Sequence, residues 1–231
     1  MIEPLVTEGD RHLQAAFSTP PRITAARAVL LGEGEPQNPV LRLHSGWAVR
    51  VRFLPNGRRA VLAIHLPGDL IGLGSLLARS EGASVIALTA AAYQSVAADE
   101  LRRLILARPE GMLRVVHLVD RERRRLEDLT IALGRCNAEQ RVALLLLDLH
   151  SRLRSKKLIE ATAFRLPLTQ AEIGDHLGLT VVHVNRVLRS LREQGIASIS
   201  HGVATIHNLE RLRGSAETPL PEEREPGRQA E

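Results

Sequence analysis

The stretch VVHVNRVLRSLREQ, residues 181–194, carries polar side chains whose types and spacing could do chemistry. Arg186 can donate paired hydrogen bonds to a guanine, and Asn185 or His183 can reach bases or phosphates. Such contacts are made in the major groove of duplex DNA when a helix presents the side chains together. The stretch therefore raises the hypothesis of sequence-specific DNA contact.

Apolar residues in the same stretch fall at the spacing of a helix. Thr180 is placed to cap this helix, and Gly195 is placed to end it. The apolar face, which we expect to be buried, consists of Val184, Val187, Leu188 and Leu191. The exposed face then carries Val182, His183, Asn185, Arg186 and Arg189.

A shorter predicted helix, residues 170–177, precedes this one. Thr169 and Glu172 form a capping-box pattern at its start, and Gly178 breaks it. Two short helices with a turn of about three residues between them are the helix-turn-helix arrangement. A structural helix pair with solvated arginines is the alternative.

The following segment, IASISHGVATIHN, predicts a small hairpin that turns at His201-Gly202 and lies as a wing behind the helix pair. A protein-docking module would expose an apolar helix face, whereas the predicted helix of residues 181–194 exposes Asn and Arg. We therefore favour DNA as the binding partner. Arg189 is expected to contact the DNA backbone or to be a solvated charge, not to read bases. The predicted DNA-contact residues are Thr169, Thr180, Val182, His183, Asn185, Arg186, Arg189 and His201.

Before the helical part, residues 29–97 show short apolar runs separated by turn residues. Val49 and Val51 alternate with arginines, and Pro55-Asn56-Gly57 supplies a tight turn into a second strand. This pattern predicts an antiparallel barrel or jelly roll. A metal enzyme built on such a barrel needs closely spaced histidines, and no His-x-His occurs. We therefore expect no enzyme and no metal site.

A long helix is predicted from Met112 to Gly134, since the segment contains no helix breaker. Its apolar residues fall at alternating steps of about three and four, as in helices that pair with a parallel copy. We expect a homodimer; packing against the chain's own barrel is the alternative. The predicted seam comprises Met112, Val115, Val119, Leu126, Leu129 and Leu133.

The chain is therefore expected to be an α+β protein in four parts. They are an antiparallel β jelly roll (1–110), a dimerisation helix (111–135), a winged helix-turn-helix (136–213) and a disordered tail (214–231). Asn137 and Gln140 form a capping-box pattern at the start of the third part. The formal charge of +5 is a mild bias towards polyanions. No apolar run approaches the ~20 residues of a membrane helix, and the start lacks a signal-peptide pattern, so we expect a cytoplasmic protein.

In this order, the barrel, long helix and winged helix-turn-helix resemble the cyclic AMP receptor protein and fumarate and nitrate reduction regulator family (CRP/FNR). The sequence LGLTVVHVNR is most similar to members of the FNR and FixK types. The motifs that carry the resemblance are LHSGWAVRV, LPGDLIG, AEQRVALLLLDL and LTQAEIGDHLGLTVVHVNRVLRSLREQGI. The resemblance implies a homodimeric transcription regulator, with duplex DNA and RNA polymerase as partners. It also implies a cyclic-nucleotide-binding-like fold for the barrel.

Residue by residue, the resemblance argues against two effectors of the family. Cyclic AMP binding members have a Gly-Glu pair and an Arg-Ser pair in the barrel, where this chain reads Gly72-Leu73 and Ala83-Ser84. The carboxylate and the guanidinium that a buried nucleotide needs are both missing. Cluster-binding members use N-terminal cysteines, whereas the only cysteine here is Cys136. We expect no cofactor.

On the recognition helix, the resemblance assigns the guanine-reading role to Arg186. Asn185 and Val182 match the two other base-reading positions, but Val182 stands where many members have Glu. The implied target is a palindrome of the TTGA-like class with altered preference at the position that the Glu would read.

Three hypotheses for control stay open. One is haem or an apolar ligand in the barrel, with His44, His65 or His117 as donor; each is more simply a structural histidine. Another is redox sensing by Cys136 at the start of a helix, where the dipole favours the thiolate; a buried small apolar residue is the simpler interpretation of Cys136. The third, which the missing ligand groups favour, is no effector at all.

Overall fold

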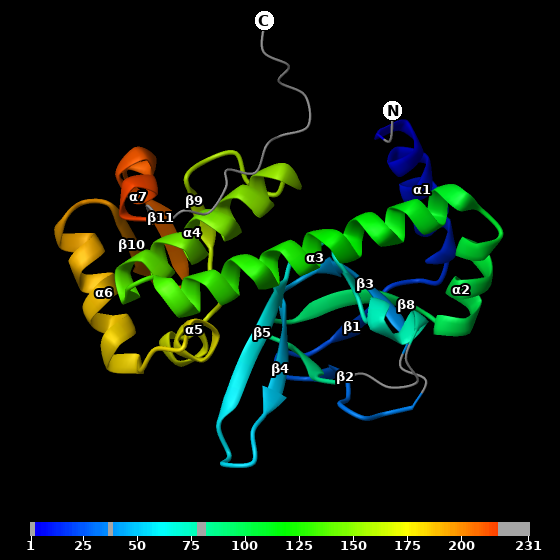
Figure 1. Ribbon diagram of the computed structural model, residues 1–231, viewed down its shortest axis with the longest axis horizontal. Coiled ribbons are helices and arrows are strands. Elements are labelled where there is room, and N and C mark those ends of the chain that lie inside the picture. The colour runs from blue at the N-terminus through cyan, green and yellow to red at the C-terminus, as the bar shows by residue number, and fades with distance from the viewer. Residues whose placement is uncertain (1–2, 37–38, 78–81, 217–231) are drawn as a thin grey trace, which may run out of the picture.

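A long helix, α3 (Pro109–Arg135), runs along the molecule and connects a β-sheet lobe to a mostly helical lobe (Figure 1). The computed structural model describes residues 3–36, 39–77 and 82–216. Among these residues, no helix is both long and apolar enough to cross a membrane.

The N-terminal lobe contains two antiparallel four-stranded sheets, with strand orders β1-β8-β3-β6 and β2-β7-β4-β5. This confirms the predicted antiparallel β-domain. Its strands are β1 (Arg22–Thr24), β2 (Val29–Leu31), β3 (Val40–Ser45), β4 (Ala48–Phe53), β5 (Arg59–His65), β6 (Leu70–Ile71), β7 (Ser84–Ala87) and β8 (Ala91–Val96), with a 3-10 helix, η1 (Leu73–Leu76), after β6. Apolar side chains from both sheets fill the space between them: Leu31, Leu41, Leu43, Ala48, Ile71, Val85, Ala87 and Ala91.

Strands β4 and β5 form the predicted hairpin, in which Val49 pairs with Ile64. Gly57 in the connecting turn has φ +77°, a conformation that Gly adopts at little cost. A bulge after Arg50 shifts the register. Val49, Val51, Val61 and Ile64 all join the core on the side of the C-terminal lobe.

Two helices of the N-terminal lobe have no counterpart in the sequence-based prediction: α1 (Glu3–Ala16) and α2 (Ala98–Leu106). Leu13 and Phe17, at the end of α1, share an apolar cluster with Val115 of α3. Arg114 Nε also lies 2.6 Å from Asp10 Oδ1. One side of the first half of α3 is therefore covered by α1.

This packing corrects the predicted seam on α3. Val115 is buried in the cluster with α1, and Leu129 packs against the core of the C-terminal lobe, so neither lies on an exposed seam. Val116, which was not predicted, is exposed instead. The apolar residues left exposed at helical spacing are Met112, Val116, Val119, Leu126 and Leu133.

The C-terminal lobe follows directly after α3. Its helices are α4 (Ala138–Ser155), α5 (Gln170–Leu177), α6 (Val181–Glu193) and α7 (Leu209–Ser215), and its strands are β9 (Ala163–Arg165), β10 (Ala197–Ser200) and β11 (Val203–Ile206), in the order β10-β11-β9. Asn137 and Gln140 form the predicted capping box at the start of α4. One continuous apolar core joins Leu146 and Leu149 of α4 to Ile64 of the barrel.

The chain end differs from the prediction of a tail that begins at Gly214. Gly214 and Ser215 belong to α7, and Ala216 is buried. The rest of the predicted disordered tail, residues 217–231, lies outside the described residues.

Candidate nucleic-acid interface

The first helix of the predicted pair, α5, begins with a complete capping box. The Thr169 hydroxyl accepts a hydrogen bond from the Glu172 backbone N–H (3.2 Å), and Glu172 Oε2 accepts one from the Thr169 backbone N–H (2.8 Å). Burial by itself would raise the pKa of Glu172, but these hydrogen bonds and the Arg27 guanidinium hold it below its usual value. Glu172 is therefore a buried carboxylate that stays ionised.

The turn between α5 and α6 depends on two glycines. Gly178 ends α5 with φ +64°, in the left-handed region that favours Gly. A Cβ atom on Gly174 would lie 2.5 Å from the Leu179 carbonyl oxygen. Only a residue without a side chain at position 174 lets the chain turn this tightly, so the angle between the two helices depends on it.

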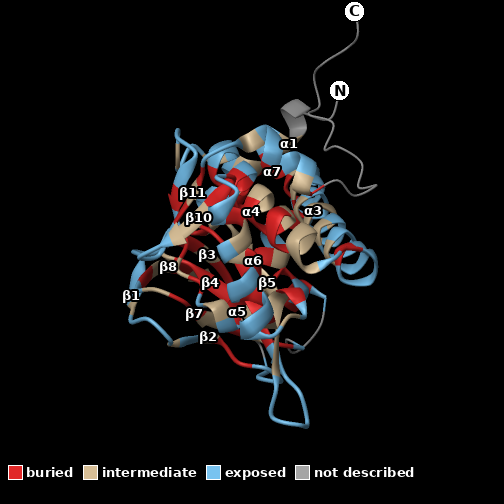
Figure 2. Ribbon diagram, turned by 90° about the vertical axis from the view of Figure 1, so that its left-hand side faces the viewer, coloured by how far each residue is buried: buried red, intermediate tan, exposed pale blue. Residues whose placement is uncertain are grey.

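Helix α6 separates its residues into a buried and an exposed face, as predicted. Thr180 caps it by accepting a hydrogen bond from the His183 backbone N–H (3.3 Å). The residues buried on its inner face are Val184, Val187 and Leu191. Figure 2 shows the exposed outer sides of α5 and α6 on one surface of the molecule.

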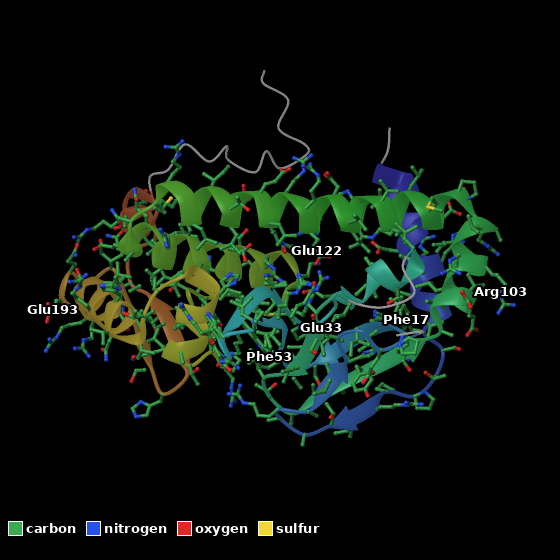
Figure 3. The ribbon with its side chains drawn as sticks, turned by 60° about the horizontal axis from the view of Figure 1, so that its bottom comes forward. Phe17, Glu33, Phe53, Arg103, Glu122 and Glu193 are labelled. Carbon is green, nitrogen blue, oxygen red and sulfur yellow. The ribbon has the colours of Figure 1, made fainter. Side chains whose placement is uncertain are left out.

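Each residue of the predicted DNA-contact set is exposed. The set is Thr169, Thr180, Val182, His183, Asn185, Arg186, Arg189 and His201. Val182 is apolar and 76% exposed, so its side chain is accessible on the outer face of α6. Arg189 forms an ion pair with Glu193 (3.5 Å), one helical turn on, so its charge is partly balanced. Figure 3 shows Glu193 at one end of the molecule and Arg103 of α2 at the other.

The predicted wing is present and has one strand more than expected. His201 and Gly202 form its turn with φ values of +50° and +73°, as in the tight hairpin turns in which both central residues have positive φ. His201 Nδ1 lies 2.9 Å from the Ser200 hydroxyl. Strand β9, which pairs with β11, was missed because a three-residue strand leaves too short a pattern in the sequence.

Arg141 is a structural residue of this region that the sequence analysis did not identify. It lies in the first turn of α4, and its guanidinium donates hydrogen bonds to carbonyl oxygens at the end of α3 and of α5. These acceptors are Leu133 (2.8 Å), Cys136 (2.9 Å) and Leu177 (3.1 Å). One side chain thereby links the long helix to the helix-turn-helix.

Cys136 caps the end of α3 and is 5% exposed. A buried thiol is poorly accessible to oxidants, so the redox role of Cys136 stays a hypothesis. The three candidate histidines lie on different elements. His44 on β3 lies 2.6 Å from Gln94, and His117 is on α3. Burial, with smaller effects of nearby arginines, lowers the pKa of His65 to about 4, although the nearby Asp69 carboxylate opposes the shift. Among the described residues, no group of three or more His, Cys, Asp or Glu side chains could hold a metal ion.

The barrel positions that correspond to the family's nucleotide-binding pairs hold no charged side chain. Leu73 lies in an apolar cluster with Leu101 of α2. Ala83 is buried, and the Ser84 hydroxyl accepts a hydrogen bond from the Glu33 backbone N–H (3.1 Å). Neither position supplies a charge for a ribose or a phosphate.

Comparison with known proteins supports the assignment of both lobes. Residues 21–108 match the model of the cyclic nucleotide-binding domain, and residues 140–215 match that of the Crp-like helix-turn-helix domain. The nitrogen fixation regulation protein FixK of Bradyrhizobium diazoefficiens is 32% identical over 165 residues, which cover 71% of this chain and 68% of FixK.

Two further similarities cover most of the chain. The anaerobic regulatory protein of Pasteurella multocida is 29% identical over 181 residues, which cover 78% of this chain and 66% of that protein. The structure of FixK2 from Bradyrhizobium japonicum superposes with a TM-score of 0.79 at 29% identity, covering 87% of this chain and 98% of FixK2. These relatives are regulators, and the likeness extends from the barrel to the helix-turn-helix. The chain therefore belongs to the CRP/FNR family of transcription regulators.

Proposed function

We propose that this protein binds a palindromic DNA operator as a homodimer, with helix α6 of each subunit in the major groove. The observation that carries the proposal is the exposed face of α6, where His183, Asn185 and Arg186 lie on a helix whose opposite face is fully packed. An Arg and an Asn on one exposed helical face suit direct readout of bases.

Within the site, we assign separate roles to the side chains. Arg186 donates paired hydrogen bonds to a guanine, and Asn185 and Val182 contact neighbouring bases. Arg189 and the wing residue His201 contact phosphates, which set the position of the protein on the duplex. Thr169 and Thr180 lie at the two helix starts, where backbone N–H groups favour a phosphate.

Dimerisation is proposed through the exposed apolar residues of α3. Val116 and Val119 are 56% and 48% exposed. Their spacing from Leu126 and Leu133 places all four side chains along one side of the helix. In a symmetric dimer, two copies of α6 about 34 Å apart would read half-sites about 10 bp apart. RNA polymerase is the proposed protein partner at the promoter.

The proposed activity requires no effector. Leu73 and Ala83 leave the barrel without the charged groups that hold a cyclic nucleotide, and apolar side chains fill the space between its sheets. An ion pair within the chain also connects the barrel to α3, because Arg50 of β4 pairs with Glu122 of α3 (3.4 Å). Control through Cys136 is the second candidate, since this residue lies where α3 meets the DNA-binding lobe.

Fluorescence anisotropy tests the proposal with a labelled palindromic duplex of the TTGA-like class. Arg186→Ala should weaken binding about 10- to 100-fold, because a bidentate contact to a base is lost. Arg103→Ala, at the opposite end of the molecule, is the control with the same change in charge and should bind like wild type (Figure 3). Equal weakening by both variants would mean that binding follows overall charge and not α6.

A further inference from the structure

Three residues of α5 contact the barrel, although they lie more than a hundred positions away in the sequence. Arg59 Nε of β5 lies 2.7 Å from Asp175 Oδ2, and Arg59 Nη2 lies 3.8 Å from Glu172 Oε1. His176 Nδ1 lies 2.9 Å from the carbonyl oxygen of Val61. We call this set, together with Arg27, the barrel–α5 contact.

Glu172 gives the barrel–α5 contact its connection to the helix-turn-helix. The side chain is 1% exposed, and its two oxygens have different partners. Oε2 accepts the hydrogen bonds of Thr169 that begin α5, whereas Oε1 receives the guanidinium groups of Arg27 and Arg59. A single buried carboxylate therefore fixes both the start of α5 and its position against the barrel.

The barrel–α5 contact lies on one side of α5, and α6 packs on another. Glu172, Asp175 and His176 are three and four positions apart, which places them on one helical face. Ile173 and Leu177 point instead into the core that contains Val184 of α6. Helix α5 therefore lies between the barrel and the recognition helix, so a shift of α5 must move α6.

This arrangement leaves the proposed reading face free. Arg186 and Asn185 are exposed while the contact is formed, so the barrel does not cover them. Arg27, which pairs with Glu172, lies in a turn with φ +70°, which is unusual for a residue other than Gly. Because Arg27 is 52% exposed and Arg59 28%, Arg59 should contribute more to the contact.

On these grounds, which rest on the proposed function, we infer that Arg59 is a positioning residue for DNA binding. It touches no DNA and acts through Glu172 and Asp175, holding α5, and with it α6, in the orientation that reaches the major groove. The sensor-like barrel would then serve as a permanent support for the helix-turn-helix.

Full-length Arg59→Ala tests this inference, with Arg58→Ala as its matched control. Arg58 is exposed in the same hairpin, so its removal changes the charge equally. Arg59→Ala should weaken operator binding about tenfold, and Arg58→Ala less than about twofold. In a double-mutant cycle, Asp175→Ala should add little once Arg59 is absent, because the two residues share one contact.

Two readouts distinguish positioning from other roles. The slope of log Kd against log salt should stay at the wild-type value in Arg59→Ala, since no phosphate contact is lost. Amide hydrogen exchange of residues 170–193 in free protein should accelerate about tenfold in Arg59→Ala and stay unchanged in Arg58→Ala. Thermal unfolding must show that Arg59→Ala is fully folded at the assay temperature.

The inference is overturned if Arg59→Ala binds the operator with wild-type affinity or with a smaller salt slope. It is also overturned if Arg59→Ala binds more tightly than wild type, because the contact would then hold α6 in a non-binding orientation. If the wild-type protein selects no operator, the proposed function fails. The exchange experiment alone then decides whether Arg59 holds α5, and unchanged exchange in Arg59→Ala overturns the inference.

Discussion

Replacement of Arg141 by Met should destabilise the junction between α3, α4 and α5. Met keeps much of the length and apolar volume of the side chain but removes all three hydrogen bonds to backbone carbonyl groups. Two of these bonds are partly buried, and the third is exposed. At about 1.5 kcal/mol for each partly buried bond and nothing for the exposed one, the free energy of unfolding should fall by about 3 kcal/mol.

Urea unfolding followed by circular dichroism measures this loss. Arg154→Met is the matched control because Arg154 is an exposed residue of the same helix; its effect should stay within about 0.5 kcal/mol. If Arg141→Met costs no more than the control, water replaces the guanidinium at the carbonyl groups. The assignment of Arg141 as the link between the three helices would then be wrong.

Three further predictions concern the turn, the barrel and the long helix. Gly174→Val should abolish operator binding and lower the melting temperature, because even the Cβ atom would lie 2.5 Å from the Leu179 carbonyl oxygen. His65 has a native pKa of about 4, below its ordinary value of 6.5, so the unfolded chain binds more protons between these values. The contribution of neutral His65 to stability should therefore be complete above pH 6.5 and be lost as the pH drops towards 4. His65→Gln should remove this part of the pH dependence in urea titrations; a pH profile of the variant that equals the wild-type profile would contradict the assignment. Val116→Asp should give a folded monomer in sedimentation experiments, whereas Val115→Ala should keep the dimer and lower the free energy of unfolding by about 1–3 kcal/mol; a dimeric Val116→Asp would exclude the proposed seam.

Local signals explain which parts of the DNA-binding lobe could be predicted from the sequence. The capping boxes at Asn137 and Thr169 involve residues three positions apart, and the turn at His201-Gly202 has its own backbone preference. Such features need no knowledge of distant parts of the chain. The exposure of Asn185 and Arg186 followed from the helical period alone.

The seam on α3 shows where periodicity is insufficient. Val115 and Val116 both fit steps of three and four residues, and only the packing of α1 decides which of them is covered. Helix α1 itself was missed, and its approach to α3 is close: a Cβ atom on Gly9 would lie 2.3 Å from the Glu110 carbonyl oxygen. This contact joins residues about 100 positions apart, which no local pattern reveals.

The barrel–α5 contact was unpredictable for the same reason. Arg59 and Asp175 are separated by 116 positions. In the sequence, each is an ordinary charged residue beside a predicted element. Only the folded chain shows that Glu172, identified from sequence as a helix cap, also receives two arginines from the barrel.

The central claim is that the protein reads DNA sequence through α6 without an added effector. Its most direct test is selection from a pool of random duplex DNA by purified, untreated wild-type protein, with Arg186→Ala in parallel and the bound fractions sequenced. We predict enrichment of a two-fold palindrome with half-sites about 10 bp apart, which the variant fails to enrich. A folded, dimeric wild-type protein that enriches no palindrome, or a variant that enriches the same one, would contradict the claim.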